Sequence, residues 1–263
     1  MADRGTSLLA SDEPSPVEVL RPHGASDFVL TADHAGRRIP RRLGTLGLAE
    51  PELSRHIAWD IGIAAVTRHL AERLDAAAIL QTYSRLVIDC NRRPGGEGSI
   101  AVLSEATRVP GNEALAPAEA AARKDAVFVP YHAAIARLLD ARAAARRRTV
   151  LVAMHSFTPI FKGAARGMHL GILYNRDPRF ARILLDLLKS ERDLVVGDNA
   201  PYRVSDETDY TIPVHGERRG LPHVEIELRQ DLIGAAAGQL QWAERLARLL
   251  AAADARLIKE EKR

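Results

Sequence analysis

Two histidines of the sequence stand at the ends of short apolar runs. His34 follows Phe28–Ala32, and His155 follows residues 149–154. Neutral imidazole is a common zinc ligand, and one nearby carboxylate would complete a three-ligand catalytic site with a position left for water. For any single histidine, a hydrogen-bonded structural role is the alternative. We expect His34 and His155 to be ligands because both fall at strand ends, which border the ligand crevice of a parallel sheet.

Two carboxylates alternate with apolar residues in a third run, residues 224–228. Strand alternation would place Glu225 and Glu227 on one face, and burying both is costly unless each is paired or functional. One interpretation is a solvated face, or ion pairs with Arg229 or Arg203. The other makes one of the two glutamates the general base that deprotonates the attacking water.

The sequence Asp-Cys-Asn-Arg at residues 89–92 ends a further apolar run. A guanidinium group at a strand end can hold a substrate carboxylate through two parallel hydrogen bonds, so Arg92 is a candidate binding residue. A structural ion pair is the alternative for these charged residues. For Asp89 we favour the structural ion pair.

Several other chemistries are not favoured. Cys90 is the only cysteine, which excludes an intrachain disulfide and a cysteine zinc site, and we interpret it as a small core residue. The His-Glu-x-x-His helix motif of many zinc peptidases is absent. Ser156 lacks a Gly-x-Ser-x-Gly turn and directly follows His155, which argues against serine catalysis.

Strand-like runs alternate with helical patterns along the chain. The runs lie at Phe28–Ala32 and at residues 79–83, 86–90, 149–154, 168–174 and 224–228, and the helical patterns lie at residues 61–74, 118–141, 178–188 and 238–252. Asp60 is a possible N-cap of the first helix. This order predicts an α/β fold with a mostly parallel or mixed central sheet and helices on both faces.

The composition is that of one globular domain. The 263 residues are 46% hydrophobic, and no linker divides the middle of the chain. We expect residues 1–25 to be a flexible tail and residues 26–263 to be a single catalytic α/β domain. With 37 basic against 34 acidic residues and 5% aromatic residues, the sequence has no basic aromatic stripe, so we expect no nucleic-acid partner. The lack of a signal peptide or long apolar run predicts a cytoplasmic protein without a membrane partner.

Taken together, these motifs resemble the N-formylglutamate amidohydrolase family over most of the chain. The matching stretches are residues 33–40, 59–62, 83–92, 110–112, 130–132, 155–159, 199–202 and 225–232. The family resembles zinc carboxypeptidases and zinc amidases in fold. The first motif here reads Asp-His-Ala-Gly at residues 33–36, where the histidine-degradation enzymes typically have Pro-His-Ser-Gly.

The resemblance implies a metal centre with one Zn²⁺ per chain. His34 and His155 would be its imidazole ligands, and Asp60 would take the carboxylate position, where the relatives have glutamate. Glu227 corresponds to the catalytic base of the relatives. His215 occupies a position that would assist the oxyanion or the leaving group.

The resemblance also implies how a substrate is held. The Asn-Arg pair of the relatives binds the substrate carboxylate, which points to Asn91 and Arg92, helped by Arg85 or Arg166. The expected reaction is zinc-dependent hydrolysis of the amide bond of an N-acyl amino acid, with N-formyl-L-glutamate giving formate and glutamate. The alternatives are a zinc amidase or peptidase for another N-acyl amino acid or a peptidoglycan stem peptide, or a silent binding protein. The oligomeric state is left open.

Overall fold

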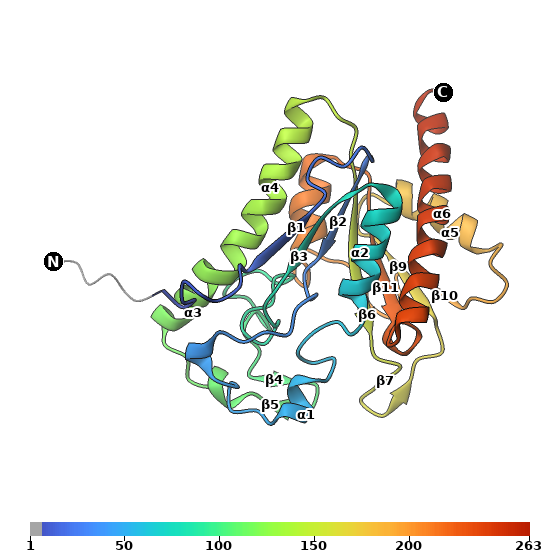
Figure 1. Cartoon of the computed structure of the whole chain (residues 1–263). Helices are drawn as coiled ribbons and strands as arrows, with labels where there is room; N and C mark the ends of the chain where they lie inside the picture. Colours follow the sequence, from blue (N-terminus) through green and yellow to red (C-terminus); the bar gives the residue numbers. More distant parts are fainter. Residues whose placement is uncertain (1–6) are drawn as a thin grey trace.

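The computed structural model describes residues 7–263, and a seven-stranded mixed sheet forms its centre (Figure 1). In sheet order the strands are β1 (Val17–Leu20), β3 (Ala77–Gln81), β2 (Phe28–Ala32), β6 (Val150–Phe157), β11 (His223–Arg229), β9 (Leu170–Leu173) and β10 (Val196–Asp198). Strands β3, β2, β6 and β11 are parallel, whereas β1 and β9 pair antiparallel with β3 and β11. The predicted α/β class is confirmed.

Three helices cover one face of the sheet: α2 (Ile63–Leu74), α5 (Arg179–Leu188) and α6 (Ala236–Glu261) (Figure 1). Helix α2 buries residues at helical spacing, among them Val66 and Leu70. Together with alternate residues of the central strands, these helices enclose the larger of the hydrophobic clusters. Burial of these apolar side chains stabilises the packing of the three helices on the sheet.

The other face is covered by α4 (Val129–Ala144), which continues from α3 (Pro117–Arg123) through a π-helical turn at Lys124–Phe128 (Figure 1). Tyr131 and Ile135 of α4 pack against this face. Helices therefore lie on both faces, as the sequence predicts. Within the described residues, no helix combines the length and hydrophobicity needed to cross a membrane.

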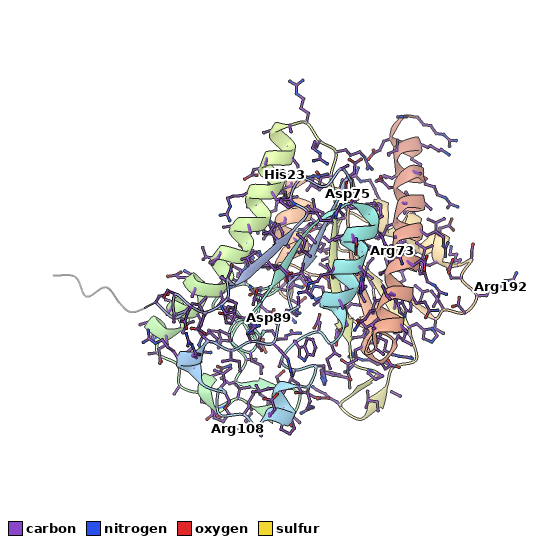
Figure 2. All side chains as sticks on the ribbon, viewed as in Figure 1. His23, Arg73, Asp75, Asp89, Arg108 and Arg192 are labelled. Carbon is purple, nitrogen blue, oxygen red and sulfur yellow. The ribbon has the colours of Figure 1, made fainter. Side chains whose placement is uncertain are left out.

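Short elements gather beyond the carboxyl ends of the central strands (Figure 1). They are α1 (Glu50–Leu53), the hairpin of β4 (Leu103–Ser104) with β5 (Thr107–Arg108), and the hairpin of β7 (Ile160–Phe161) with β8 (Ala164–Ala165). The backbone N–H of Lys162 donates to Glu105 Oε1 at 3.2 Å, which joins the two hairpins. Figure 2 places Asp89 near this end of the sheet and Asp75 at the opposite end.

Strand alternation decides which face receives the polar side chains. In β6, Val152 and Met154 belong to the cluster under α2, α5 and α6, whereas Leu151 and Ala153 belong to the cluster under α4. His155 continues the second set, so it lies on the face that α4 covers. Strand β6 also runs to Phe157, and His155 therefore lies within the strand and not beyond its end.

The expectation of a loose tail over residues 1–25 is wrong for residues 7–25. Val17–Leu20 forms the edge strand β1, in antiparallel register with β3. Leu8 is buried, and Tyr83 Oη donates a hydrogen bond to the Pro14 carbonyl at 2.9 Å. Residues 1–6 lie outside the described residues. Strand β1 is ordered because its backbone hydrogen-bonds to β3, whose N–H and C=O groups would otherwise be free at that edge of the sheet.

The predicted strand at residues 86–90 is also wrong, since this segment is a series of turns. Its apolar side chains are buried, but its backbone groups form hydrogen bonds with turns and loops and not with a neighbouring strand. The N–H of Val87 donates to the Ser84 carbonyl, the Leu86 carbonyl accepts from Asn112 Nδ2, and the N–H of Asp89 donates to the Ser99 carbonyl. Burial alone does not distinguish a strand from a buried loop.

Asp60 does not cap the following helix. Helix α2 begins at Ile63, and the capping position is Gly62, at φ 82°. A Cβ atom at Gly62 would lie 2.2 Å from the Ile233 carbonyl oxygen, so only glycine fits this close approach. The turn frees the Asp60 side chain to point away from the helix and toward the strand ends.

Candidate active site

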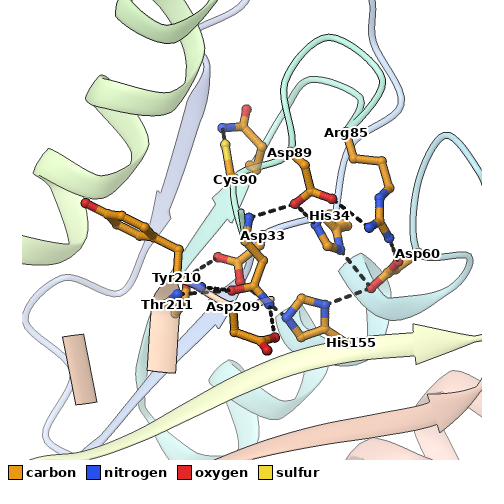
Figure 3. A network of polar contacts seen from close by, with 12 residues as sticks. Asp33, His34, Asp60, Arg85, Asp89, Cys90, His155, Asp209, Tyr210 and Thr211 are labelled. Carbon is orange, nitrogen blue, oxygen red and sulfur yellow. Dashed lines mark hydrogen bonds and ion pairs between the residues drawn. The ribbon is translucent and has the colours of Figure 1, made fainter. Parts of the chain in front are cut away.

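His34, Asp60 and His155 come together at the carboxyl ends of β2 and β6 (Figure 3). Asp60 Oδ2 lies 3.0 Å from His155 Nδ1 and 3.5 Å from His34 Nδ1. One ligand atom from each residue lies within 4.8 Å of the others, and all three residues are buried. The residues expected to bind the metal therefore form one cluster, from segments far apart in the sequence.

Backbone contacts place the Asp60 carboxylate. The N–H of Asp60 donates to the His34 carbonyl at 2.9 Å, and the N–H of Ser156 donates to Asp60 Oδ2 at 3.1 Å. Burial opposes ionisation of Asp60, but the His34 and His155 imidazoles outweigh it and lower the pKa of Asp60. The carboxylate is therefore anionic near neutral pH, as a metal ligand must be.

In both imidazole rings Nδ1 faces Asp60, and Nε2 faces a second carboxylate that fixes the orientation of the ring. Asp89 Oδ1 lies 2.7 Å from His34 Nε2, and Asp33 Oδ2 lies 3.2 Å from His155 Nε2. His34 Nδ1 is buried with no hydrogen-bond partner within residues 7–263. An unpartnered ring nitrogen, a second imidazole and a carboxylate that converge on one point are a donor set suited to Zn²⁺.

Asp89 has the structural ion pair that we favoured, and it also orients His34. Arg85 donates to Asp89 Oδ2 at 2.6 Å, and the N–H of Asn91 donates to Asp89 Oδ1 at 2.8 Å. Burial opposes ionisation, but Arg85 and then His34 hold the pKa of Asp89 well below its ordinary value. Arg85 therefore pairs with Asp89, and its Nη1 also lies 3.8 Å from Asp60 Oδ1; its side chain lines the cavity described below.

Glu225 and Glu227 point to the same face of β11, as predicted. Glu227 is in register with His155 of the parallel strand β6, and Glu225 with Ala153. Both side chains are buried, and one carboxyl oxygen of each has no hydrogen-bond partner among the described residues. The interpretation as a solvated or ion-paired face is wrong, because Arg229 instead donates to Asp231.

The two glutamates differ in how strongly they hold a proton. Burial raises the pKa of Glu227 from 4.5 to about 7, although the neighbouring His155 opposes this shift. Burial also raises the pKa of Glu225, well above its ordinary value. A base works best with a pKa near the working pH. Glu227 meets this condition near neutral pH.

The cluster opens into a cavity of about 470 Å³. Its lining comprises His34, His56, Ile57, Asp60, Arg85, Asn91, Arg92, Leu103, Ser104, Glu105, His155, Ser156, Phe157, Thr158, Phe161, Tyr202, Arg203, Thr208, Asp209, Glu225 and Glu227. Arg92 and Arg203 are guanidinium groups for which the described residues offer no ion pair or hydrogen bond. Asn91 also lines the cavity, but its Oδ1 accepts the N–H groups of Tyr210 and Thr211.

Two of the expected site residues lie outside the lining. Arg166 donates to Tyr202 Oη at 2.8 Å and stacks on the ring of Phe161, so it supports the cavity wall and does not border the cavity. His215 Nε2 lies 3.0 Å from His132 Nδ1, in a buried pair of stacked rings. Neither position supports direct contact with a substrate.

Sequence reasoning missed several lining residues. Arg203 was considered only as an ion-pair partner, and Tyr202 only as part of the matching stretch at residues 199–202. No sequence pattern indicates His56, Glu105 or Asp209, because loops carry no periodic signal. The one available signal for Arg203 was an arginine adjacent to that matching stretch.

The family model for N-formylglutamate amidohydrolase matches residues 26–234. The chain belongs to this family. The crystal structure of a gene product from Agrobacterium tumefaciens has 38% identity and a TM-score of 0.92, with 95% of this chain and 99% of that chain covered. The structure of N-formylglutamate amidohydrolase from Ralstonia eutropha JMP134 has 18% identity and a TM-score of 0.65, with 92% and 98% covered, and shares the fold. Among curated proteins, none matches the chain.

Proposed function

We propose that the protein is a zinc-dependent amidohydrolase that cleaves an N-acyl amino acid, with N-formyl-L-glutamate as the first substrate to test. The observation that carries this proposal is the cluster of His34, Asp60 and His155 with the buried carboxyl group of Glu227 beside it. Water would add to the acyl carbon and the C–N bond would break, which gives formate and glutamate from this substrate. The cytoplasmic location and a role in histidine degradation stay predictions.

The residues of the chain divide the chemistry among them. Zn²⁺ held by His34, Asp60 and His155 would polarise the acyl carbonyl and make water acidic enough to lose a proton near neutral pH. Glu227 accepts that proton and returns it to the departing nitrogen. Its pKa of about 7 suits both transfers.

Two guanidinium groups that have no ion pair within residues 7–263 support an acidic amino acid as the leaving group. Arg92 and Arg203 both line the cavity, and N-formylglutamate carries two carboxylates. Each guanidinium group can hold one carboxylate by paired hydrogen bonds. Asn91 holds the loop at Tyr210 and Thr211 in place, and Arg166 supports the wall through Tyr202.

A second candidate is hydrolysis of a longer N-acyl amino acid, or of a peptidoglycan stem peptide. Ile57, Leu103, Phe157 and Phe161 give the cavity an apolar portion that a formyl group does not need. Leu103 and Phe161 come from the two hairpins that Glu105 joins. An apolar acyl chain placed there would gain about fourfold in affinity for each buried methylene group.

The experiment is a panel of N-formyl, N-acetyl and N-butyryl derivatives of glutamate, glutamine and leucine, assayed with zinc-loaded enzyme. The proposal expects release of acid and free amine, with the highest kcat/KM for N-formylglutamate. Higher kcat/KM for the butyryl derivatives would select the second candidate. Absence of hydrolysis across the panel, with zinc bound, would favour a silent binding protein instead.

A further inference from the structure

Asp33 is a buried carboxylate at the carboxyl end of β2, next to the metal centre. The residue is 1% exposed. Tyr131 Oη of α4 donates to Asp33 Oδ1 at 2.7 Å, and Thr211 Oγ1 donates to the same oxygen at 2.8 Å. One carboxylate oxygen is thus held by two hydroxyl groups from segments far apart in the sequence. Asp33, Tyr131 and Thr211 do not line the cavity.

The second oxygen of Asp33 is directed at His155. Asp33 Oδ2 lies 3.2 Å from His155 Nε2. Both atoms are buried, and among residues 7–263 neither makes a hydrogen bond, so the 3.2 Å contact is an ion-pair contact and not an aligned hydrogen bond. A carboxylate oxygen can only accept a hydrogen bond, so this contact is favourable when Nε2 carries a proton.

The position of this proton decides what His155 offers on its other side. Its Nδ1 lies 3.0 Å from Asp60 Oδ2, at the point where the three ligand atoms converge. Nδ1 is hydrogen-bonded to Asp60 Oδ2, and a metal ligand must give up that proton; a proton kept on Nε2 then leaves the lone pair of the neutral ring at Nδ1. A carboxylate opposite the outer nitrogen of a metal-binding histidine fixes its tautomer and ring orientation.

We propose that Asp33 is a positioning residue that holds the His155 ring with its Nδ1 lone pair toward the metal, and that Tyr131 and Thr211 hold Asp33. This inference rests on the proposed metal centre and deepens it. His34 has the equivalent arrangement with Asp89, but Asp89 is held by the Arg85 guanidinium group. Asp33 instead connects the metal centre to α4 through Tyr131.

The alternative is that Asp33 only joins α4 to the sheet. A purely structural carboxylate would affect stability and leave the metal affinity of the folded protein unchanged. Asn112 provides a matched control for this alternative, since it is buried and its amide joins loops through Leu86, Ala101 and Arg123. It lies outside the lining of the cavity.

The test measures zinc affinity of the full chain by competition with a chromophoric chelator. Asp33→Asn is expected to weaken zinc binding by about 10–100-fold, and Asn112→Ala is expected to leave it unchanged. Equal affinity of folded wild type and Asp33→Asn would overturn the inference while the metal centre stands. A wild-type protein that binds no zinc would overturn both. If Asp33→Asn does not fold, Tyr131→Phe decides: a several-fold loss supports the inference and unchanged affinity overturns it.

Proton NMR of the zinc-loaded protein adds a readout that a structural role would not move. In the wild type, the Nε2–H of His155 is buried against Asp33 and is expected to give a slowly exchanging low-field resonance. Asp33→Asn should lose or shift that resonance, and the corresponding resonance of His34, opposite Asp89, should persist as an internal control. Two unchanged resonances would contradict the inference.

Discussion

The two faces of the sheet bury different kinds of side chain. Under α2, α5 and α6 the contacts are apolar, with residues such as Phe180, Leu246 and Leu250 packed on the strands. At the carboxyl edge of the face under α4, the chain buries seven charged or titratable side chains, and Figure 3 labels Asp33, His34, Asp60, Asp89 and His155 among them. The seven are Asp33, His34, Asp60, Asp89, His155, Glu225 and Glu227.

This difference separates what stabilises the fold from what the site needs. Apolar burial of the first kind contributes stability in proportion to area. Burying carboxylates costs free energy unless they are paired, and Glu225 and Glu227 each have one oxygen without a hydrogen-bond partner in the described part of the chain. Buried carboxyl groups without hydrogen-bond partners are expected at a functional site. The free energy that their burial costs is offset by apolar packing elsewhere in the structure. Substitutions in the two regions should therefore change different quantities.

The largest effect on the reaction is expected from His155→Ala. This substitution removes one of three ligands, so the purified protein should lose its zinc and its amidohydrolase activity. Elemental analysis and circular dichroism of both proteins provide the test. A variant that keeps one zinc per chain would exclude His155 from the metal centre.

Glu227→Gln is expected to lower kcat by about 10²–10⁴-fold at full zinc occupancy, because glutamine keeps the shape but cannot accept a proton. Glu225→Gln is the matched control in the same strand, with a much smaller expected effect. If Glu225→Gln proves to be the inactive variant, the two roles are reversed.

The pKa of Glu227 also predicts a pH dependence. The base acts in its ionised form, so kcat/KM should fall as the pH decreases below about 7. The raised pKa has the opposite consequence for stability. Because the folded metal-free protein binds the proton more tightly than the unfolded chain, its free energy of unfolding should decrease as pH rises from about 4.5 to about 7. Chemical denaturation of the metal-free protein at pH 5 and pH 8 tests this, and Glu227→Gln should show a smaller decrease.

A moderate effect is expected from Arg92→Lys and Arg203→Lys, since ammonium keeps the charge and loses the paired hydrogen bonds. Each should raise KM for N-formylglutamate by about 10-fold, as for loss of one charged hydrogen bond. With N-formylglutamine, which lacks the side-chain carboxylate, one of the two variants should behave like wild type. If neither variant changes KM, the carboxylates are bound elsewhere.

The smallest effect on the reaction is expected from Leu246→Ala in α6. The side chain is fully buried in the apolar layer, so the free energy of unfolding should decrease by about 2–5 kcal/mol. Zinc content and kcat of the folded fraction should not change. Denaturant titration alongside kcat at low temperature tests the separation, and a parallel loss of zinc would show that the two regions are coupled.

Sequence patterns predicted the helices and strands in which buried residues recur at a regular spacing. The strand at Phe28–Ala32 and the alternation of Glu225 and Glu227 were predictable because burial on one or both faces leaves a regular pattern. His34 was predictable from its place after a strand, and His155 from its place after an apolar run, although β6 continues past it to Phe157. Arg203 was not identified as a lining residue because it lies in a loop, and loops carry no period that would show where they return to the site.

Other errors have the same physical origin. Arg166 and His215 were expected in the site from their sequence positions. The contact of Arg166 with Tyr202 shows that it lies behind the cavity wall, and the contact of His215 with His132 shows that it lies away from the cavity. Edge strand β1 was missed because its alternation is short and half-buried. Asp33, adjacent to an expected ligand, gave no hint in sequence that it faces the other histidine.

The most direct test of the account is removal and return of the metal. Zinc-loaded protein is assayed for formate release from N-formyl-L-glutamate, treated with a chelator, dialysed and assayed again before and after addition of one equivalent of Zn²⁺. The account predicts that activity disappears with the metal and returns at one zinc per chain, and that His155→Ala is not restored. Full activity of the metal-free protein, or restoration of His155→Ala to the wild-type rate, would contradict it.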